Sequence, residues 1–275
     1  MAAALALLSG LLWGTADFGG GLVTRRLPSL VVVGWSQAAA FVALAIGAVV
    51  TRTGPPAGPW LVWGLLTGVA GAGGLVCFYR ALSTGTMGVV SPIAGLGALV
   101  PVVADLLAGH IPTMVQGIGM AVALLGAVAA SGPELSGGAS SSSVVLAAVA
   151  GLLFGLTFVG MDHGAVYSPL YTAIGMRLAS LLLFGALAVA TASLGGVRPM
   201  DLPMLAAVGI ADGAANLIFS IASTMGLVSV VAVLGSLYPV ATVLLARAFL
   251  AERLRPVQVV GVVAALGGVA MVSAG

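Results

Sequence analysis

A line of polar side chains runs along one otherwise apolar stretch of the sequence, residues 203–223. Asp212, Asn216 and Ser220 follow one another at intervals of four residues, which places them on one face of a helix. An ionisable side chain is costly inside a membrane, so it is expected to face a cavity that holds water or a solute. The alternative is that Asp212 and Asn216 hydrogen-bond to neighbouring helices. We predict that both side chains line a cavity.

A second acid, Asp17, lies within the apolar stretch 4–23. A carboxyl group in a low-dielectric medium favours its neutral form, so Asp17 is the leading candidate for a side chain that exchanges a proton during a working cycle. Alternatively, Asp17 pairs with an arginine or caps a helix break near Gly19. Asp105 lies near the end of the stretch 86–108, and we expect it at the membrane interface.

Arg177 lies about nine residues into the apolar stretch 168–193. A guanidinium at this depth could bind the carboxylate of a solute or neutralise one of the acids. It could equally extend to the lipid headgroups, as long basic side chains often do. The three roles stay open at this point.

Aromatic side chains offer a second kind of contact. In a central cavity, Trp13 and Tyr238 would stack on an organic solute or hold a cation over a ring face. Trp60 and Trp63 open the stretch 60–79 and are expected to anchor it at the membrane boundary.

Two prolines, Pro101 and Pro239, occupy equivalent positions in the stretches 86–108 and 226–249. Each removes a backbone donor and is expected to kink its helix. Kinks at related positions suit a gating role, and a purely structural bend is the alternative.

The composition places all of these residues in a membrane. The chain of 275 residues is 61% hydrophobic and only 6% charged, and its mean hydropathy is +1.24, so it has too little polar surface for a soluble domain. One cysteine and two histidines exclude an intramolecular disulfide and argue against a zinc site. The chain has no lysine, so it has no Walker A motif, and its scattered arginines do not indicate nucleic-acid binding.

Apolar runs of about 20 residues, the length that crosses a bilayer, predict an all-α integral membrane protein. The expected spans are 4–23, 30–50, 60–79, 86–108, 114–131, 144–163, 168–193, 203–223, 226–249 and 256–274. A connector rich in Gly and Ser follows the fifth span and is expected to be flexible.

The chain contains an internal repeat. Residues 86–107 match residues 224–245 at 13 of 22 positions, with a constant offset of 138. Weaker matches at offsets of 141 and 142 extend the repeat to both ends of each half. We therefore expect a first repeat at 1–131, a linker at 132–143 and a second repeat at 144–275. Each repeat holds five spans, an odd number, so the two repeats are inverted in the membrane, a design that places the solute site between them.

Three short motifs indicate a family: Leu12-Trp13-Gly14, Met176-Arg177-Leu178-Ala179, and Ala251-Glu252-Arg253-Leu254 followed by Gln258 and Gly261. With ten spans in two halves, the chain resembles the EamA-type members of the drug/metabolite transporter superfamily. The resemblance implies secondary transport of small solutes, often export of amino acids, metabolites or drugs, without a bound cofactor. His110 stands where the family usually has Glu, and Ser36-Gln37 replace the Arg seen at Arg177, which argues against symmetric use of the two halves.

We therefore predict a multi-pass carrier of the cell membrane, coupled to protons or to a solute gradient, that exports a small organic solute by alternating access. The predicted site residues are Trp13, Asp17, Arg177, Asp212, Asn216 and Tyr238, with Pro101 and Pro239 at kinks. One chain is sufficient to enclose a site, and a dimer is left open. The alternatives are an intramembrane enzyme acting on a lipid-linked substrate, for which Asp162-His163 is the nearest candidate pair, and a structural membrane subunit.

Overall fold

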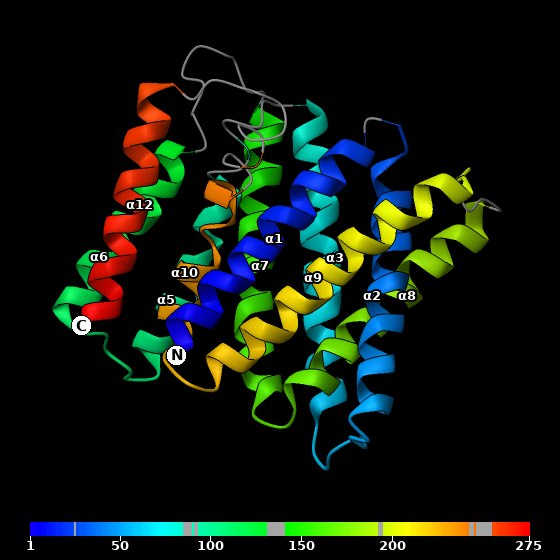
Figure 1. Cartoon of the computed structure of the whole chain (residues 1–275), viewed down its shortest axis with the longest axis horizontal. Coiled ribbons are helices and arrows are strands. Elements are labelled where there is room, and N and C mark those ends of the chain that lie inside the picture. The colour runs from blue at the N-terminus through cyan, green and yellow to red at the C-terminus, as the bar shows by residue number, and fades with distance from the viewer. Residues whose placement is uncertain are drawn as a thin grey trace.

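In its described parts the chain is built from helices joined by turns and loops (Figure 1). The computed structural model describes residues 1–24, 26–84, 90, 93–130, 141–191, 195–241, 245 and 255–275. The first half contains α1 (Ala2–Val23), α2 (Ser29–Val50), α3 (Trp60–Thr84), η1 (Leu96–Ala98), α5 (Leu99–Leu107) and α6 (Met114–Ala130). The second contains α7 (Ser141–Ala165), α8 (Pro169–Thr191), η2 (Pro199–Asp201), α9 (Leu202–Ser223), α10 (Val228–Gly235) and α12 (Pro256–Ala274). Helix is present at all ten expected spans, which confirms the all-α membrane fold built from two five-helix repeats.

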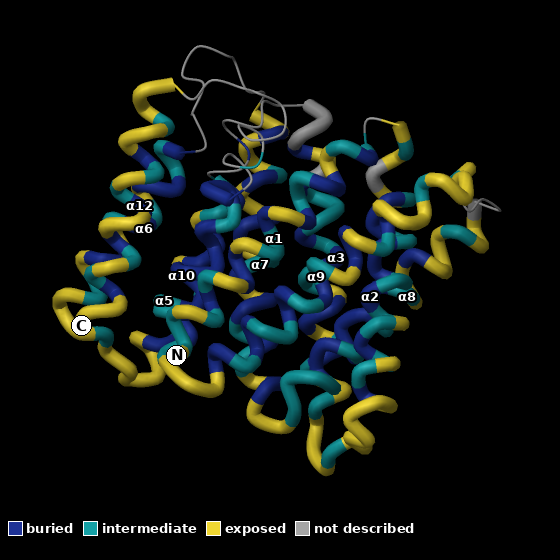
Figure 2. The backbone as a smooth tube through the Cα atoms, viewed as in Figure 1, coloured by how far each residue is buried: buried dark blue, intermediate teal, exposed yellow. Residues whose placement is uncertain are grey.

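The outer faces of these helices are apolar. Within the described residues, seven helices are long and apolar enough to cross a membrane, among them α1, α7 and α9. Val49, Leu66 and Val189 are each more than half exposed on the isolated chain, and Figure 2 shows buried positions toward the centre of the bundle and exposed ones along outer helices such as α12. Such a surface is stable in lipid and not in water.

The two halves interlock. α1 packs against α9 and α10, whereas α3 packs against α7 and α8. α7 in turn contacts η1 and α5, so the first helix of each repeat lies against the fourth helix of the other, as an inverted repeat requires. α6 and α12, the fifth helix of each repeat, pair at one edge of the bundle (Figure 1). The space between the halves is therefore walled by helices from both.

The two predicted kink positions coincide with irregular helix. A 3-10 turn, η1, precedes α5 and ends three residues before Pro101. In the second half, α10 ends at Gly235 and a turn at Ser236 follows, where the amide of Leu237 bonds the carbonyl of Leu234 at 3.3 Å. A proline lacks the N–H that would bond the carbonyl four residues earlier, which here belongs to Gly97 and to Gly235.

Several expected spans differ from the structure in their bounds or their continuity. The spans 86–108 and 226–249 are not single unbroken helices in their described parts, because η1 and the turn at Ser236 interrupt them. α7 begins at Ser141, three residues before the expected span and inside the expected linker. Residues 131–140 of that linker, and residues 246–254 with most of the third family motif, lie outside the described residues.

Glycines allow the first helices to approach the irregular ones closely. A methyl group added at Gly10 would lie 2.9 Å from the carbonyl oxygen of Gly235, and one added at Gly155 would overlap the carbonyl oxygen of Gly97. These carbonyls are the ones four residues before Pro239 and Pro101, which lack the N–H that would bond them in a regular α-helix. At each crossing between the repeats, a glycine of the first helix therefore lies against the carbonyl four residues before the proline, although Gly10 and Gly155 are one helical turn apart in the repeat alignment.

We expect Gly155→Ala to separate α7 from η1 and to lower the free energy of unfolding by about 1–3 kcal/mol, the usual cost of overpacking. The matched control is Gly185→Ala in α8, where an added methyl meets no atom within 4 Å. Thermal unfolding in detergent compares the two. Equal melting temperatures for both variants would contradict the close crossing.

Candidate functional site: a cavity between the repeats

A cavity between the halves reaches the six predicted solute-site residues. It holds about 860 Å³ of space, counting its open mouth. Its lining includes Trp13, Asp17, Arg177, Asp212, Asn216 and Tyr238. These side chains come from α1, α8, α9 and the segment after α10, so residues more than 200 positions apart in the sequence share one space. Pro101 and Pro239 are buried in the helices around it.

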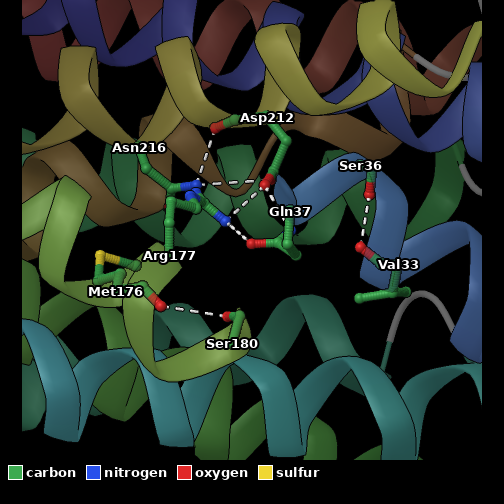
Figure 3. Close-up of polar contacts among 8 residues, drawn as sticks. All are labelled: Val33, Ser36, Gln37, Met176, Arg177, Ser180, Asp212 and Asn216. Atoms are coloured by element: carbon green, nitrogen blue, oxygen red, sulfur yellow. Dashed lines mark hydrogen bonds and ion pairs between the residues drawn. The ribbon is translucent and has the colours of Figure 1, made fainter. Parts of the chain in front are cut away.

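An ion pair lies in the wall of the cavity (Figure 3). Arg177 Nη1 lies 2.9 Å from Asp212 Oδ2, and the Arg177 side chain is only 5% exposed. Arg177 is therefore not extended to the headgroups. Of the three roles open from the sequence, the geometry places this guanidinium as the neutralising partner of an acid.

Gln37 forms hydrogen bonds with both members of the ion pair, and it was not among the predicted site residues. Its Nε2 donates a hydrogen bond to Asp212 Oδ2 at 3.1 Å, while its Oε1 accepts one from Arg177 Nη1. One feature of the sequence could have indicated Gln37: the first repeat has Ser36-Gln37 where the second repeat has Arg177. In the structure, Gln37 contacts this arginine.

Asn216 lies one helical turn further along α9 and contacts Asp212. Its Nδ2 donates to the Asp212 backbone carbonyl at 2.8 Å and lies 3.4 Å from Asp212 Oδ1. Ser220, the third member of the polar line, is fully buried and does not line the cavity. Only the Asp212 and Asn216 part of the line faces the cavity.

Repeat-equivalent positions line the cavity with different chemistry. At the offset of 141 residues, Asp17 corresponds to Phe158, Asp212 to Gly71, and Asn216 to Leu75. All six of these residues line the cavity. The fold thus supplies the same set of positions twice, and the sequence makes one set polar and the other apolar.

The apolar part of the lining is rich in aromatic rings. The ring centroid of Trp13 lies 5.6 Å from those of Phe158 and Phe219, and the latter two rings stack at 4.9 Å. Phe154, the counterpart of Trp13 in the second repeat, also lines the cavity. Aromatic contacts of this kind hold Trp13 in place while leaving part of it exposed to the cavity.

Asp17 is a half-buried acid of the lining. Within the described part of the chain it forms no ion pair within 4 Å, because Arg177 pairs with Asp212. The arginine-paired alternative for Asp17 therefore finds no partner among these residues.

Asp105 lies away from the cavity and joins the repeats. It is only 6% exposed, and its Oδ2 accepts a hydrogen bond of 2.8 Å from the backbone N–H of Ser229, in the first turn of α10. The exposed ring of His110 lies 3.7 Å from the other carboxylate oxygen. A carboxylate at this place satisfies an amide that has no partner within the helix and opposes the helix dipole.

Asp105→Ala should therefore cost about 1 kcal/mol of stability, the typical value of a lost helix cap. Asp105→Asn keeps an oxygen acceptor and should lose less. Chemical denaturation of both variants in mixed micelles measures which of them loses more stability. If alanine and asparagine were equally harmful, the oxygen acceptor would not explain the role of Asp105.

The family assignment follows from a comparison with known families. The model of the EamA-like transporter family matches residues 1–132 and again residues 141–274, so the chain belongs to this family. It is thus a multi-pass membrane protein of a transporter family, as its motifs indicate.

The fold has a solved counterpart. An experimental structure described only as "Crystal structure of protein" covers 98% of this chain and 95% of its own, with a TM-score of 0.82 and 21% sequence identity. At this identity the likeness concerns the fold alone. A comparison with curated protein sequences gave no significant match.

Proposed function

We propose that this protein is a secondary carrier that exports a small organic solute, such as an amino acid, a metabolite or a drug, across the cell membrane by alternating access. The observation that carries the proposal is the cavity between the inverted repeats, whose lining includes both a polar cluster and aromatic rings. Transporters of this design bind their solute between the repeats and move one repeat against the other. One chain provides the whole site.

The mixture of lining groups supports an amphipathic solute. Trp13 and Phe154 offer apolar surface, whereas Asp212 and Asn216 offer fixed polar groups beside it. A pocket that is largely apolar with a few oriented polar groups is typical of sites for small molecules. Pro101 and Pro239, next to the interrupted helices, are the proposed bending points of the cycle.

Asp17 is the proposed proton site. It lines the cavity and forms no ion pair with the described residues, so a proton is the simplest way to neutralise it in a dehydrated state. Coupling follows if the cavity opens to one side with Asp17 neutral and to the other with Asp17 ionised.

The enzyme alternative receives no support from its best candidate pair. The Asp162 carboxylate lies near the Ser223 side chain, while His163 Nδ1 contacts the carbonyl of Val159 at 3.0 Å and its ring lies 4.8 Å from that of Trp63. The two side chains are engaged with different partners, and neither lines the cavity. We therefore propose that the protein is not an enzyme.

Proteoliposomes under an imposed pH gradient test the proposed coupling. Against a panel of amino acids, organic acids and cationic drugs, the parent protein should accumulate at least one solute. Asp17→Asn should abolish this accumulation and retain exchange of labelled for unlabelled solute, because exchange needs no net proton movement. Asp201→Asn, in η2 away from the cavity, is the matched control. Gradient-driven accumulation by Asp17→Asn would remove Asp17 as the proton site.

A further inference from the structure

Two of the three nitrogens of the Arg177 guanidinium make no hydrogen bond to the described residues. Nη1 serves both Asp212 and Gln37. Nε and Nη2, by contrast, are buried and have no hydrogen-bond partner among the residues that the structure describes. The residue as a whole is 4% exposed and belongs to the cavity lining.

An unused charged donor at such a depth needs an acceptor. Leaving a buried donor unsatisfied costs about 1–3 kcal/mol, and more when the donor is charged. The N–H groups of Nε and Nη2 lie parallel on one edge of the planar guanidinium, a spacing that matches the two oxygens of a carboxylate. The other edge cannot rotate into this role without breaking the pair with Asp212.

We propose that the Nε–Nη2 edge of Arg177 is the subsite for a carboxylate group of the transported solute. The proposal rests on the proposed carrier function and adds the chemical class of its solute. Asp212 and Gln37 then act as positioning residues, because they hold Nη1 and thereby fix the plane of the guanidinium.

The charges of the lining limit which carboxylates fit. Asp212 already neutralises Arg177, so a bound carboxylate adds a negative charge to a cavity that also contains Asp17. The solute must therefore carry a compensating cationic group or bind while Asp17 is neutral. Trp13, on the same helix as Asp17, offers a ring face to such a cation.

The test is a binding comparison between carboxylates and their amides. Isothermal titration of the purified protein in nanodiscs would use four matched pairs, namely benzoate, phenylacetate, L-leucine and L-phenylalanine, each against its primary amide. The parent should bind at least one carboxylate about tenfold or more tightly than the amide, as expected for hydrogen bonds to a charged group. The subsite is contradicted if no carboxylate binds or if every amide binds equally well.

Two variants separate the free edge from the ion pair. Arg177→Lys keeps a cation for Asp212 but has no second N–H edge, and Arg177→Gln with Asp212→Asn keeps a neutral, hydrogen-bonding pair if the lysine variant does not fold. Either variant should reduce the carboxylate preference to less than about threefold, since the paired donors are gone. An unchanged preference would overturn the proposal.

A failure of the carboxylate subsite and a failure of the carrier function would give different results. Carboxylate preference without any transport in proteoliposomes would leave the subsite standing and contradict the carrier. Transport of a solute with no preference for its carboxylate over its amide would leave the carrier standing and contradict the subsite.

Discussion

Replacing Asp212 with alanine should lower the free energy of unfolding by about 3–5 kcal/mol, because it leaves a buried arginine without its counter-charge. The Arg177 side chain is 5% exposed and that of Asp212 is 22% exposed, so water compensates little of the loss. Gln37 and Asn216 would each also lose an acceptor. Thermal and chemical unfolding in detergent measures the effect.

The double variant Arg177→Gln with Asp212→Asn provides the control. It removes both charges together, so it should regain most of the stability that Asp212→Ala loses, while the carrier loses its charged pair and its transport. A double variant as unstable as the single one would show that the ion pair is not the cause of the instability.

Gly95→Phe should reduce transport by more than about tenfold, because a bound solute fills most of such a pocket and the new ring would occupy that space. Gly95 lines the cavity, and a side chain built at this position begins in open space, with no atom within 4 Å. The substitution therefore blocks the site without forcing the helices apart. Initial rates of solute exchange in proteoliposomes measure the loss.

Gly185→Phe is the matched control for the blocked cavity. Gly185 lies on the exposed face of α8, also with no atom within 4 Å of an added side chain, so this variant should transport like the parent. Full activity of Gly95→Phe with native stability would mean that solute does not pass through this cavity.

The fold could be predicted from the sequence because its two signals are strong and independent. Long apolar runs define the spans, and the repeat of 86–107 in 224–245 defines the two halves. The breaks were harder to place. Pro101 and Pro239 predicted bends, but the extent of η1 and the early end of α10 depend on packing between helices from opposite halves.

The site was predicted in part for a similar reason. Asp17, Arg177 and Asp212 are conspicuous because ionisable residues are rare in apolar spans. The pairing of Arg177 with Asp212 and Gln37 is tertiary, and no local pattern encodes it. Phe158 does not stand out in the sequence, although its place at the repeat equivalent of Asp17 would have indicated that it lines the cavity.

The most direct test of the carrier is solute counterflow, with the chemical identity of the solute checked by mass spectrometry. Proteoliposomes preloaded with the solute should take up labelled solute faster than empty ones, with saturation, and the solute should be recovered unchanged, because a carrier returns its site to the other side fastest when the site is loaded. Uptake that does not depend on preloading and does not saturate, or recovery of a chemically altered product, would contradict alternating access through the cavity between the repeats.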